Sequence, residues 1–171
     1  MDAVGVPYVV KGSMAANFYV MPRMSGDIDF LINPQPRDKP FVVKVLAEDF
    51  FVDPDVIRNA FNDRSMFQVI DPNGHVKSDL IFWTPKFNPE TVFERAQTMQ
   101  IEGTGLSVIA PEDLIIAKLI WAKESRSELQ FRDVHSLLKF EELDGEYVRQ
   151  QAMAYGVPEL LREASDERYA T

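Results

Sequence analysis

The chain has 171 residues, enough for one domain with a sizeable core, and its 27 acidic and 18 basic residues give a net charge of −9. Without a basic stripe or tail, the composition argues against broad duplex nucleic-acid binding, and the lack of cysteine excludes disulfides, thiolate metal sites and cysteine nucleophiles. No apolar run reaches membrane-spanning length and no signal peptide is recognisable, so we expect a soluble, cytoplasmic protein.

The first part of the chain alternates short strand patterns with helix patterns. We predict a strand at residues 7–11, a helix from Ser13 to about Tyr19, and a strand at "DIDFLIN", residues 27–33. Residues 33–40 read as a loop, and residues 41–49 as a helix. Asp53 followed by Pro54 predicts a capped helix start, with the helix reaching about Asn62.

The middle of the chain contains turn and cap signals. Asn73-Gly74 predicts a hairpin between strands at "SMFQVID" and "VKSDLIFW". Asn88-Pro89-Glu90 predicts the start of a helix that reaches about Met99. Short strands are expected at residues 99–102 and 106–109, joined by the turn "GTG".

Only helix patterns follow residue 110. They run from Pro111 to about Lys123, from Glu128 to Lys139, from a cap at Asp144 to Gly156, and onward from Pro158. Strands mixed with helices, followed by helices alone, predict an α+β fold. We divide it into an α/β core at residues 1–110 and a helical C-terminal portion at 111–171, packed together as one continuous domain.

Three aspartates stand out as candidate metal ligands. Asp27 and Asp29 lie two apart in a strand pattern and therefore face the same side. If the strand carrying Asp79 pairs beside theirs, three carboxylates meet without a counter-charge and repel one another unless a divalent cation neutralises them. Magnesium suits such an all-oxygen site. The alternative is that Asp27 ends a turn and Asp29 lies on a solvated sheet face.

Gly12 and Ser13 are candidates for a phosphate site. Glycine permits a sharp turn and close approach of a ligand, and Ser13 is expected to cap the helix, whose first N–H groups attract anions. The alternative is a serine cap without a ligand.

The combination of these features resembles the signature of the nucleotidyltransferase superfamily that includes DNA polymerase beta. The matching segments are "VVKGS", "DIDFL" and "SDLIF", and the order G-S-x-A, Y-x-x-P-R-x-[ST]-x-D-I-D is similar to that of small bacterial stand-alone enzymes related to abortive-infection and toxin–antitoxin systems. Later, "APEDLIIAKLIWAK" and "QFRDVHSLL" resemble the family's C-terminal helices. The resemblance spans most of the chain.

The resemblance implies a mixed sheet packed with helices and an active site that binds a nucleoside triphosphate (NTP). It implies Asp27, Asp29 and Asp79 as catalytic residues that hold two Mg²⁺ ions, and four nucleotide-binding residues: Gly12, Ser13, Arg23 and Lys118. Three features depart from the pattern. Lys11 replaces a small or apolar residue, Val20 replaces a common glycine, and the helix that usually precedes the first strand is nearly absent, which would leave a core face for a partner chain.

The two basic candidates each have an alternative role. Lys118 lies in a helix that is apolar almost all round, so it either pairs with Asp133 of the next helix or reaches a phosphate. Arg23 either steadies a triphosphate or is a solvated loop arginine.

We therefore expect nucleotidyl transfer to a hydroxyl acceptor, which in this superfamily is a small antibiotic, a tRNA end or a protein. The second hypothesis is a catalytically silent binding or antitoxin-like module, alone or as a homo-oligomer or with a partner protein. A third is another Mg²⁺-dependent phosphate enzyme, such as a phosphohydrolase, which the Gly-Ser helix start fits less well.

Overall fold

The computed structural model describes residues 5–170 and is built on a six-stranded mixed sheet. The strands are β1 (Tyr8–Lys11), β2 (Asp27–Ile32), β3 (Met66–Ile70), β4 (Lys77–Phe82), β5 (Gln97–Ile101) and β6 (Thr104–Val108), in the spatial order β3-β4-β2-β1-β6-β5. The pairs β1/β2, β3/β4 and β5/β6 are antiparallel, whereas β2/β4 and β1/β6 are parallel. The predicted strand segments are therefore present.

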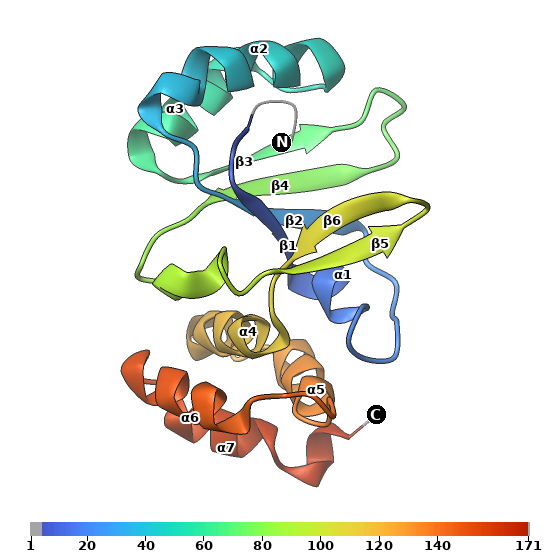
Figure 1. The fold of residues 1–171 in the computed structure, drawn as a ribbon, viewed down its shortest axis with the longest axis vertical. Coiled ribbons are helices and arrows are strands. Elements are labelled where there is room, and N and C mark those ends of the chain that lie inside the picture. Colours follow the sequence, from blue (N-terminus) through green and yellow to red (C-terminus); the bar gives the residue numbers. More distant parts are fainter. Residues whose placement is uncertain (1–4, 171) are drawn as a thin grey trace.

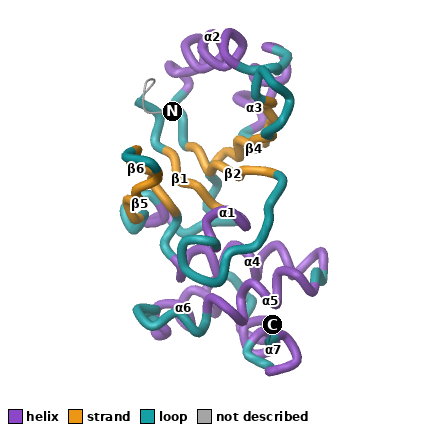
Figure 2. Tube along the Cα trace, turned by 90° about the vertical axis from the view of Figure 1, so that its right-hand side faces the viewer, coloured by secondary structure: helices purple, strands orange, loops and turns teal. Residues whose placement is uncertain are grey.

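Within residues 5–170, seven α-helices pack on the two sides of the sheet. They are α1 (Gly12–Ala16), α2 (Lys39–Asp49), α3 (Pro54–Asp63), α4 (Pro111–Ser125), α5 (Glu128–Leu137), α6 (Gly145–Ala154) and α7 (Pro158–Ala164), with short 3₁₀ helices at Pro36–Asp38, Glu90–Val92 and Glu167–Tyr169. Helices α2 and α3 lie at one end of the molecule and α4 to α7 at the other, with the sheet between them (Figures 1 and 2). The predicted α+β class with a helical C-terminal portion is confirmed.

The central strand β2 is buried on both faces. Leu31 and Ile32 are both fully buried, and because successive strand residues point to opposite faces, they belong to different hydrophobic clusters. Ile32 packs with residues of α2 and α3, and Leu31 packs with α1 and with residues such as Leu114 and Leu119 of α4. The cluster that contains Leu31 joins the sheet to the C-terminal helices. The division of the chain at residue 110 stays a prediction.

Local signals predicted several element ends correctly. Asp53 caps α3 by accepting a hydrogen bond from the Asp55 amide at 2.8 Å, and Asp144 caps α6 by accepting one from the Tyr147 amide at 3.0 Å. Gly156 follows α6 with a φ of +66°, a left-handed conformation that glycine adopts at little cost. Among residues 5–170, no helix is long and apolar enough to cross a membrane.

Three element predictions were wrong. The helix expected from Asn88-Pro89 is only the 3₁₀ turn Glu90–Val92, because Val92 is fully buried against the core and the chain then enters β5, where Gln97 pairs with Val108. Tertiary pairing overrides the cap signal here. The loop predicted at 33–40 contains the 3₁₀ turn Pro36–Asp38 and the start of α2, and the first helix ends at Ala16 rather than near Tyr19.

Candidate active site

Asp29 and Asp79 lie directly opposite each other on neighbouring parallel strands. The register of β2 and β4 pairs Asp29 with Asp79 and Asp27 with Lys77. Paired residues project to the same face, as do residues two apart in one strand, so all three aspartates share a face. That face is the one covered by α1 and α4, since Leu31, two residues after Asp29, packs in their cluster. The pairing on which the three-carboxylate hypothesis depends is present.

Gly12 lies against the carboxylate of Asp29. A Cβ atom on Gly12 would be 1.8 Å from Oδ2 and 2.8 Å from Cγ of Asp29, and Gly12 has a φ of +68°. Both the backbone conformation and the contact exclude a larger residue at this position. The Gly-Ser turn and the carboxylate strand, which are 17 residues apart in sequence (Gly12 to Asp29), therefore meet in space.

The expectation that the carboxylates lack a counter-charge was wrong for Asp29. Lys11 is paired directly with Asp29 in the β1/β2 register, so its side chain lies on the same face. Burial raises the pKa of Asp29, and the carboxylates of Asp79 and Asp27 raise it further, while the charges of Lys11 and Lys118 oppose the rise. Burial lowers the pKa of Lys11, against the opposing effect of Asp29. The site holds its own cations.

Asp133 of α5 binds both basic residues that were predicted to contact the nucleotide. Its Oδ2 accepts hydrogen bonds from Lys118 Nζ at 2.6 Å and from Arg23 Nη2 at 2.9 Å, and its Oδ1 accepts one from Arg23 Nε at 3.0 Å. Burial opposes ionisation of Asp133, but the hydrogen bonds from Arg23 and the charge of Lys118 hold its pKa below the ordinary value. The predicted ion pair between Lys118 and Asp133 is present, and the Lys118 side chain is only 4% exposed.

Arg23 also connects this cluster to α1. Its Nη2 donates to the hydroxyl of Ser13, and the loop that carries it is anchored by Asn17, whose amide bonds the backbone N–H of Arg23 at 3.0 Å and its carbonyl at 2.9 Å. The prediction that Ser13 caps the helix was wrong: α1 begins after Lys11 without a side-chain cap, and Ser13 lies inside its first turn. The alternative in which Arg23 is a solvated loop arginine does not hold, because two-thirds of its side chain is buried and it pairs with Asp133.

Asp79 has a further partner on the edge strand. Gln68 of β3 is paired with Asp79 in the register and donates from Nε2 to its Oδ1 at 2.9 Å. As the side chains lie, no three acidic or histidine groups among residues 5–170 are gathered closely enough to hold a metal ion together. The strand register brings the carboxylates to one face, and their side chains are not preassembled into a ligand set.

A second buried charge network was not anticipated from the sequence. Asp113 at the start of α4 is fully buried and accepts a hydrogen bond from the Tyr147 hydroxyl at 2.8 Å, while Arg95 lies 2.8 Å from Glu112 Oε2 and 3.4 Å from Asp113 Oδ2. Burial raises the pKa of Asp113. The signal in the sequence was the pair Glu112-Asp113 at a helix start, which by itself indicates only capping. The network fixes α6 to α4.

A family model described as "Nucleotidyl transferase of unknown function (DUF2204)" matches residues 1–164. The chain belongs to this nucleotidyltransferase family. None of the curated proteins compared with the chain is a significant match. The resemblance to polymerase beta-like nucleotidyltransferases is therefore confirmed, and membership of the family implies an NTP substrate and an enzyme.

One solved structure supports the fold of this nucleotidyltransferase. It is similar to an antigenic nucleotidyltransferase-like protein from Paracoccidioides brasiliensis, with 16% identity, a TM-score of 0.56, and coverage of 96% of this chain and 86% of that one. Two structures of the antibiotic-resistance factor ANT(2'')-Ia are more distant. The solution structure has a TM-score of 0.48 at 16% identity, covering 98% of this chain and 86% of that one. The crystal structure in complex with adenylyl-2''-tobramycin has a TM-score of 0.45 at 15% identity, covering 99% of this chain and 92% of that one.

Proposed function

We propose that this nucleotidyltransferase transfers a nucleoside monophosphate from an NTP to a hydroxyl acceptor at the face of β2 and β4. Asp27, Asp29 and Asp79 form the carboxylate platform of the site. The observation that carries the proposal is the register that sets Asp29 opposite Asp79, with Gly12 in contact with Asp29. A structural role alone gives no reason for three carboxylates on one face beside a glycine in the left-handed conformation.

The carboxylates of Asp27, Asp29 and Asp79 are chemically suited to hold two Mg²⁺ ions. Three carboxylates are the hard oxygen ligands that Mg²⁺ prefers, and the raised pKa of Asp29 reflects burial together with repulsion from its two neighbours, which a divalent cation relieves. The bond from Gln68 uses only one carboxylate oxygen of Asp79, and such an outer hydrogen bond commonly orients a metal ligand. When bound, the ions would neutralise the phosphates and favour ionisation of the attacking hydroxyl.

The chemical step follows from the positions of the carboxylates. The acceptor oxygen forms a bond to the α-phosphorus of the NTP, the bond from that phosphorus to the β-phosphate oxygen breaks, and pyrophosphate leaves. Asp79, which lies on β4 of the edge hairpin, accepts the hydroxyl proton. Products are the nucleotidylated acceptor and pyrophosphate.

The first turn of α1 and the cations of the site would bind the triphosphate. Gly12 and Asp29 lie in contact at the start of α1, and the Ser13 hydroxyl lies beside the guanidinium of Arg23. Arg23 is the cation with access, because a third of its side chain is exposed, whereas Lys118 is buried behind Asp133. We therefore assign phosphate contact to Arg23, and to Lys118 contact only after the Asp133 cluster opens.

Incubation of the protein with each α-labelled NTP, Mg²⁺ and cell extract tests the proposal by asking what becomes labelled. Label should appear on an acceptor with release of pyrophosphate, and Asp29→Asn should abolish it. Full transfer by Asp29→Asn would refute the mechanism. Exchange of Asp71, an exposed-loop aspartate that bonds only backbone and side-chain groups of its own turn, for asparagine is the matched control and should leave transfer intact.

Calorimetry distinguishes this function from a silent binding module. A nucleotidyltransferase binds an NTP with a heat that depends on Mg²⁺, whereas a module that acts only through a protein partner shows none. The link to toxin–antitoxin systems, the identity of the acceptor and the oligomeric state remain predictions.

A further inference from the structure

Lys11 stands at one end of a row of polar residues that crosses four strands. Gln68 of β3 lies opposite Asp79 of β4 in the strand register. Asp79 in turn lies opposite Asp29 of β2, which lies opposite Lys11 of β1. Residues opposite one another project to the same face, so the row runs amide, carboxylate, carboxylate, ammonium. Lys11 is the member of the row to which the function proposed above gives no role.

The ammonium group of Lys11 has no partner. Its side chain is partly buried, yet it forms neither a hydrogen bond nor an ion pair with any group of residues 5–170, the carboxylate of Asp29 included. The enclosed and unpartnered side-chain atoms of the described residues belong to other residues, so Lys11 Nζ is open to a ligand. Burial lowers the pKa of Lys11, because an ammonium without a partner is costly there, and a nearby anion would offset that cost.

The other basic side chains of residues 5–170 that are not exposed each have a partner. They are Arg23 and Lys118 on Asp133, Lys39 on Asn62, and Arg95 on Glu112. Around the active site, Lys11 therefore differs from Arg23 and Lys118, whose charges are already met by Asp133.

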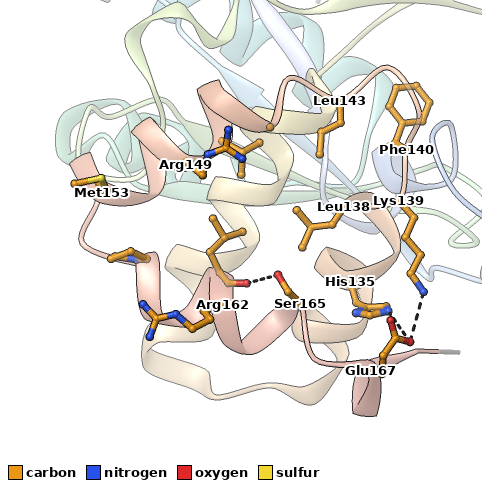
Figure 3. A pocket seen from close by; sticks show the side chains of 14 residues that line it. His135, Leu138, Lys139, Phe140, Leu143, Arg149, Met153, Arg162, Ser165 and Glu167 are labelled. Carbon is orange, nitrogen blue, oxygen red and sulfur yellow. Dashed lines mark hydrogen bonds and ion pairs between the residues drawn. The ribbon is translucent and has the colours of Figure 1, made fainter.

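Cations also line a large pocket of about 730 Å³ among α5, α6 and α7 (Figure 3). Each of them lies beside a carboxylate: Lys139 beside Glu167 at 4.0 Å, Arg149 beside Glu146 at 2.7 Å, and Arg162 beside Glu159 at 2.7 Å. An anion in this pocket would have to displace these partners, whereas an anion at Lys11 would not.

The proposed reaction has a direction along the row. In an in-line displacement the acceptor oxygen enters on one side of the α-phosphorus and pyrophosphate leaves on the other. Asp79, the base assigned to the acceptor hydroxyl, lies on β4, and Lys11 lies on β1, with β2 between these strands. An acceptor that enters from the Asp79 side therefore expels pyrophosphate toward Lys11.

We propose that Lys11 is a further catalytic residue, whose ammonium donates hydrogen bonds to the β- and γ-phosphates of the NTP and to the departing pyrophosphate. This inference rests on the function proposed above. As the bond from the α-phosphorus to the β-phosphate oxygen breaks, its electron pair stays with pyrophosphate. Lys11 keeps its proton and compensates the negative charge that develops on the leaving oxygen.

Inorganic pyrophosphate with Mg²⁺ is the probe, because it requires no knowledge of the preferred base. Lys11→Met removes the charge and keeps most of the side-chain length. Lys77→Met is the matched control, since Lys77 is exposed and lies opposite Asp27, on the acceptor side of the platform. In calorimetry, Lys11→Met should bind pyrophosphate at least about tenfold more weakly, which corresponds to about 1.4 kcal/mol. Lys77→Met should bind it as the unaltered protein does.

Metal binding without pyrophosphate separates this role from a structural one. Mn²⁺ accepts the same oxygen ligands as Mg²⁺ and is detected by electron paramagnetic resonance. It should bind Lys11→Met at least as tightly as the unaltered protein, because a competing charge has been removed from beside Asp29. If Lys11 only held Asp29 in place, the affinities for Mn²⁺ and pyrophosphate would fall together, and the proposal would be overturned.

Three other results would also overturn the proposal. They are a loss of less than about threefold in Lys11→Met, an equal loss in Lys77→Met, and the absence of Mg²⁺-dependent pyrophosphate binding by the unaltered protein. Acetylation of the unaltered protein, read by mass spectrometry, tests the contact even if Lys11→Met does not fold. Pyrophosphate with Mg²⁺ should protect Lys11 and leave Lys77 as reactive as before, and a lack of protection at Lys11 would count against the contact.

The proposed function fails on a different measurement, which is full transfer by Asp29→Asn. If Asp29→Asn abolishes transfer while Lys11→Met binds pyrophosphate normally, only the role of Lys11 is refuted.

Discussion

Gly12→Ala tests the contact between the first turn of α1 and the carboxylate platform. An alanine at a φ of +68° costs about 1–2 kcal/mol in backbone strain. In addition its Cβ would lie 1.8 Å from Asp29 Oδ2, so the carboxylate must retreat by about 1.6 Å to reach an ordinary contact of 3.4 Å. A displacement of this size at a reacting centre costs about 100-fold in turnover.

Gly103→Ala is the matched control. Gly103 has a φ of +82° in the β5–β6 turn, and a Cβ there would meet nothing within 4 Å. It should therefore lose the same stability from backbone strain, measured by urea denaturation, and retain transfer activity, measured by pyrophosphate release. Gly12→Ala should lose more stability and about 100-fold in activity.

A double-mutant cycle isolates the clash. In the background of Asp29→Ala only the Cβ of residue 29 remains, 3.2 Å from the new methyl group, so the cost of Gly12→Ala should fall most of the way to that of Gly103→Ala. If Gly12→Ala stays within about threefold of normal activity, or costs the same stability with and without the Asp29 side chain, the contact does not constrain the site and the reasoning is refuted.

Three further predictions concern the buried charges. Asp29→Asn should be at least as stable as the unaltered protein at pH 7 without metal, because the pKa of Asp29 is raised in the fold and the ionised carboxylate destabilises the folded state. This advantage should vanish as the pH falls below the ordinary carboxyl pKa. Thermal melts that show destabilisation by Asp29→Asn at pH 7 would contradict the prediction. Lys118→Met should lower the free energy of unfolding by about 3 kcal/mol, because the buried carboxylate of Asp133 loses one partner. The loss, measured by denaturation, should be clearly smaller in an Asp133→Asn background. Equal losses in both backgrounds would show that Lys118 and Asp133 are not coupled. Tyr147→Phe removes a hydrogen bond to the fully buried Asp113 and should lower the free energy of unfolding by about 2 kcal/mol while turnover stays unchanged. A loss of turnover at full stability would instead mean that this network takes part in the reaction.

Local patterns were sufficient to predict the shared face of Asp27 and Asp29. Strand periodicity needs no tertiary information, and the Asn73-Gly74 turn fixed the hairpin that carries Asp79. That β4 pairs in parallel with β2 is a property of the whole sheet, which periodicity does not contain. The register, and with it the pairing of Asp29 with Asp79, is therefore visible only in the structure.

The wrong predictions also arise because local sequence patterns do not contain tertiary contacts. Asn88-Pro89 is a good helix start, but a cap signal indicates only where a helix can begin and not how far it runs. Here Val92 is fully buried in the core, and the chain leaves the helical conformation after it. The position of Ser13 after a glycine indicates a cap, and the hydrogen bond that Ser13 accepts from Arg23 depends on the path of the loop between them. Lys11 was recognised as unusual, but its pairing with Asp29 depends on the antiparallel register of β1 and β2.

The arrangement around Asp133 bears on how the helical portion relates to the site. Arg23 comes from the loop before β2, Lys118 from α4, and both end on one carboxylate of α5. Without α5, Lys118 would be a buried cation lacking its hydrogen-bonded partner, and Arg23 would lose the two bonds that hold it beside Ser13. The helices after residue 110 therefore position the cations of the site as well as cover the sheet. Since Leu31 belongs to the same buried cluster as residues of α4, a core truncated at residue 110 would lose both hydrophobic cover and the anchoring of Arg23 at once.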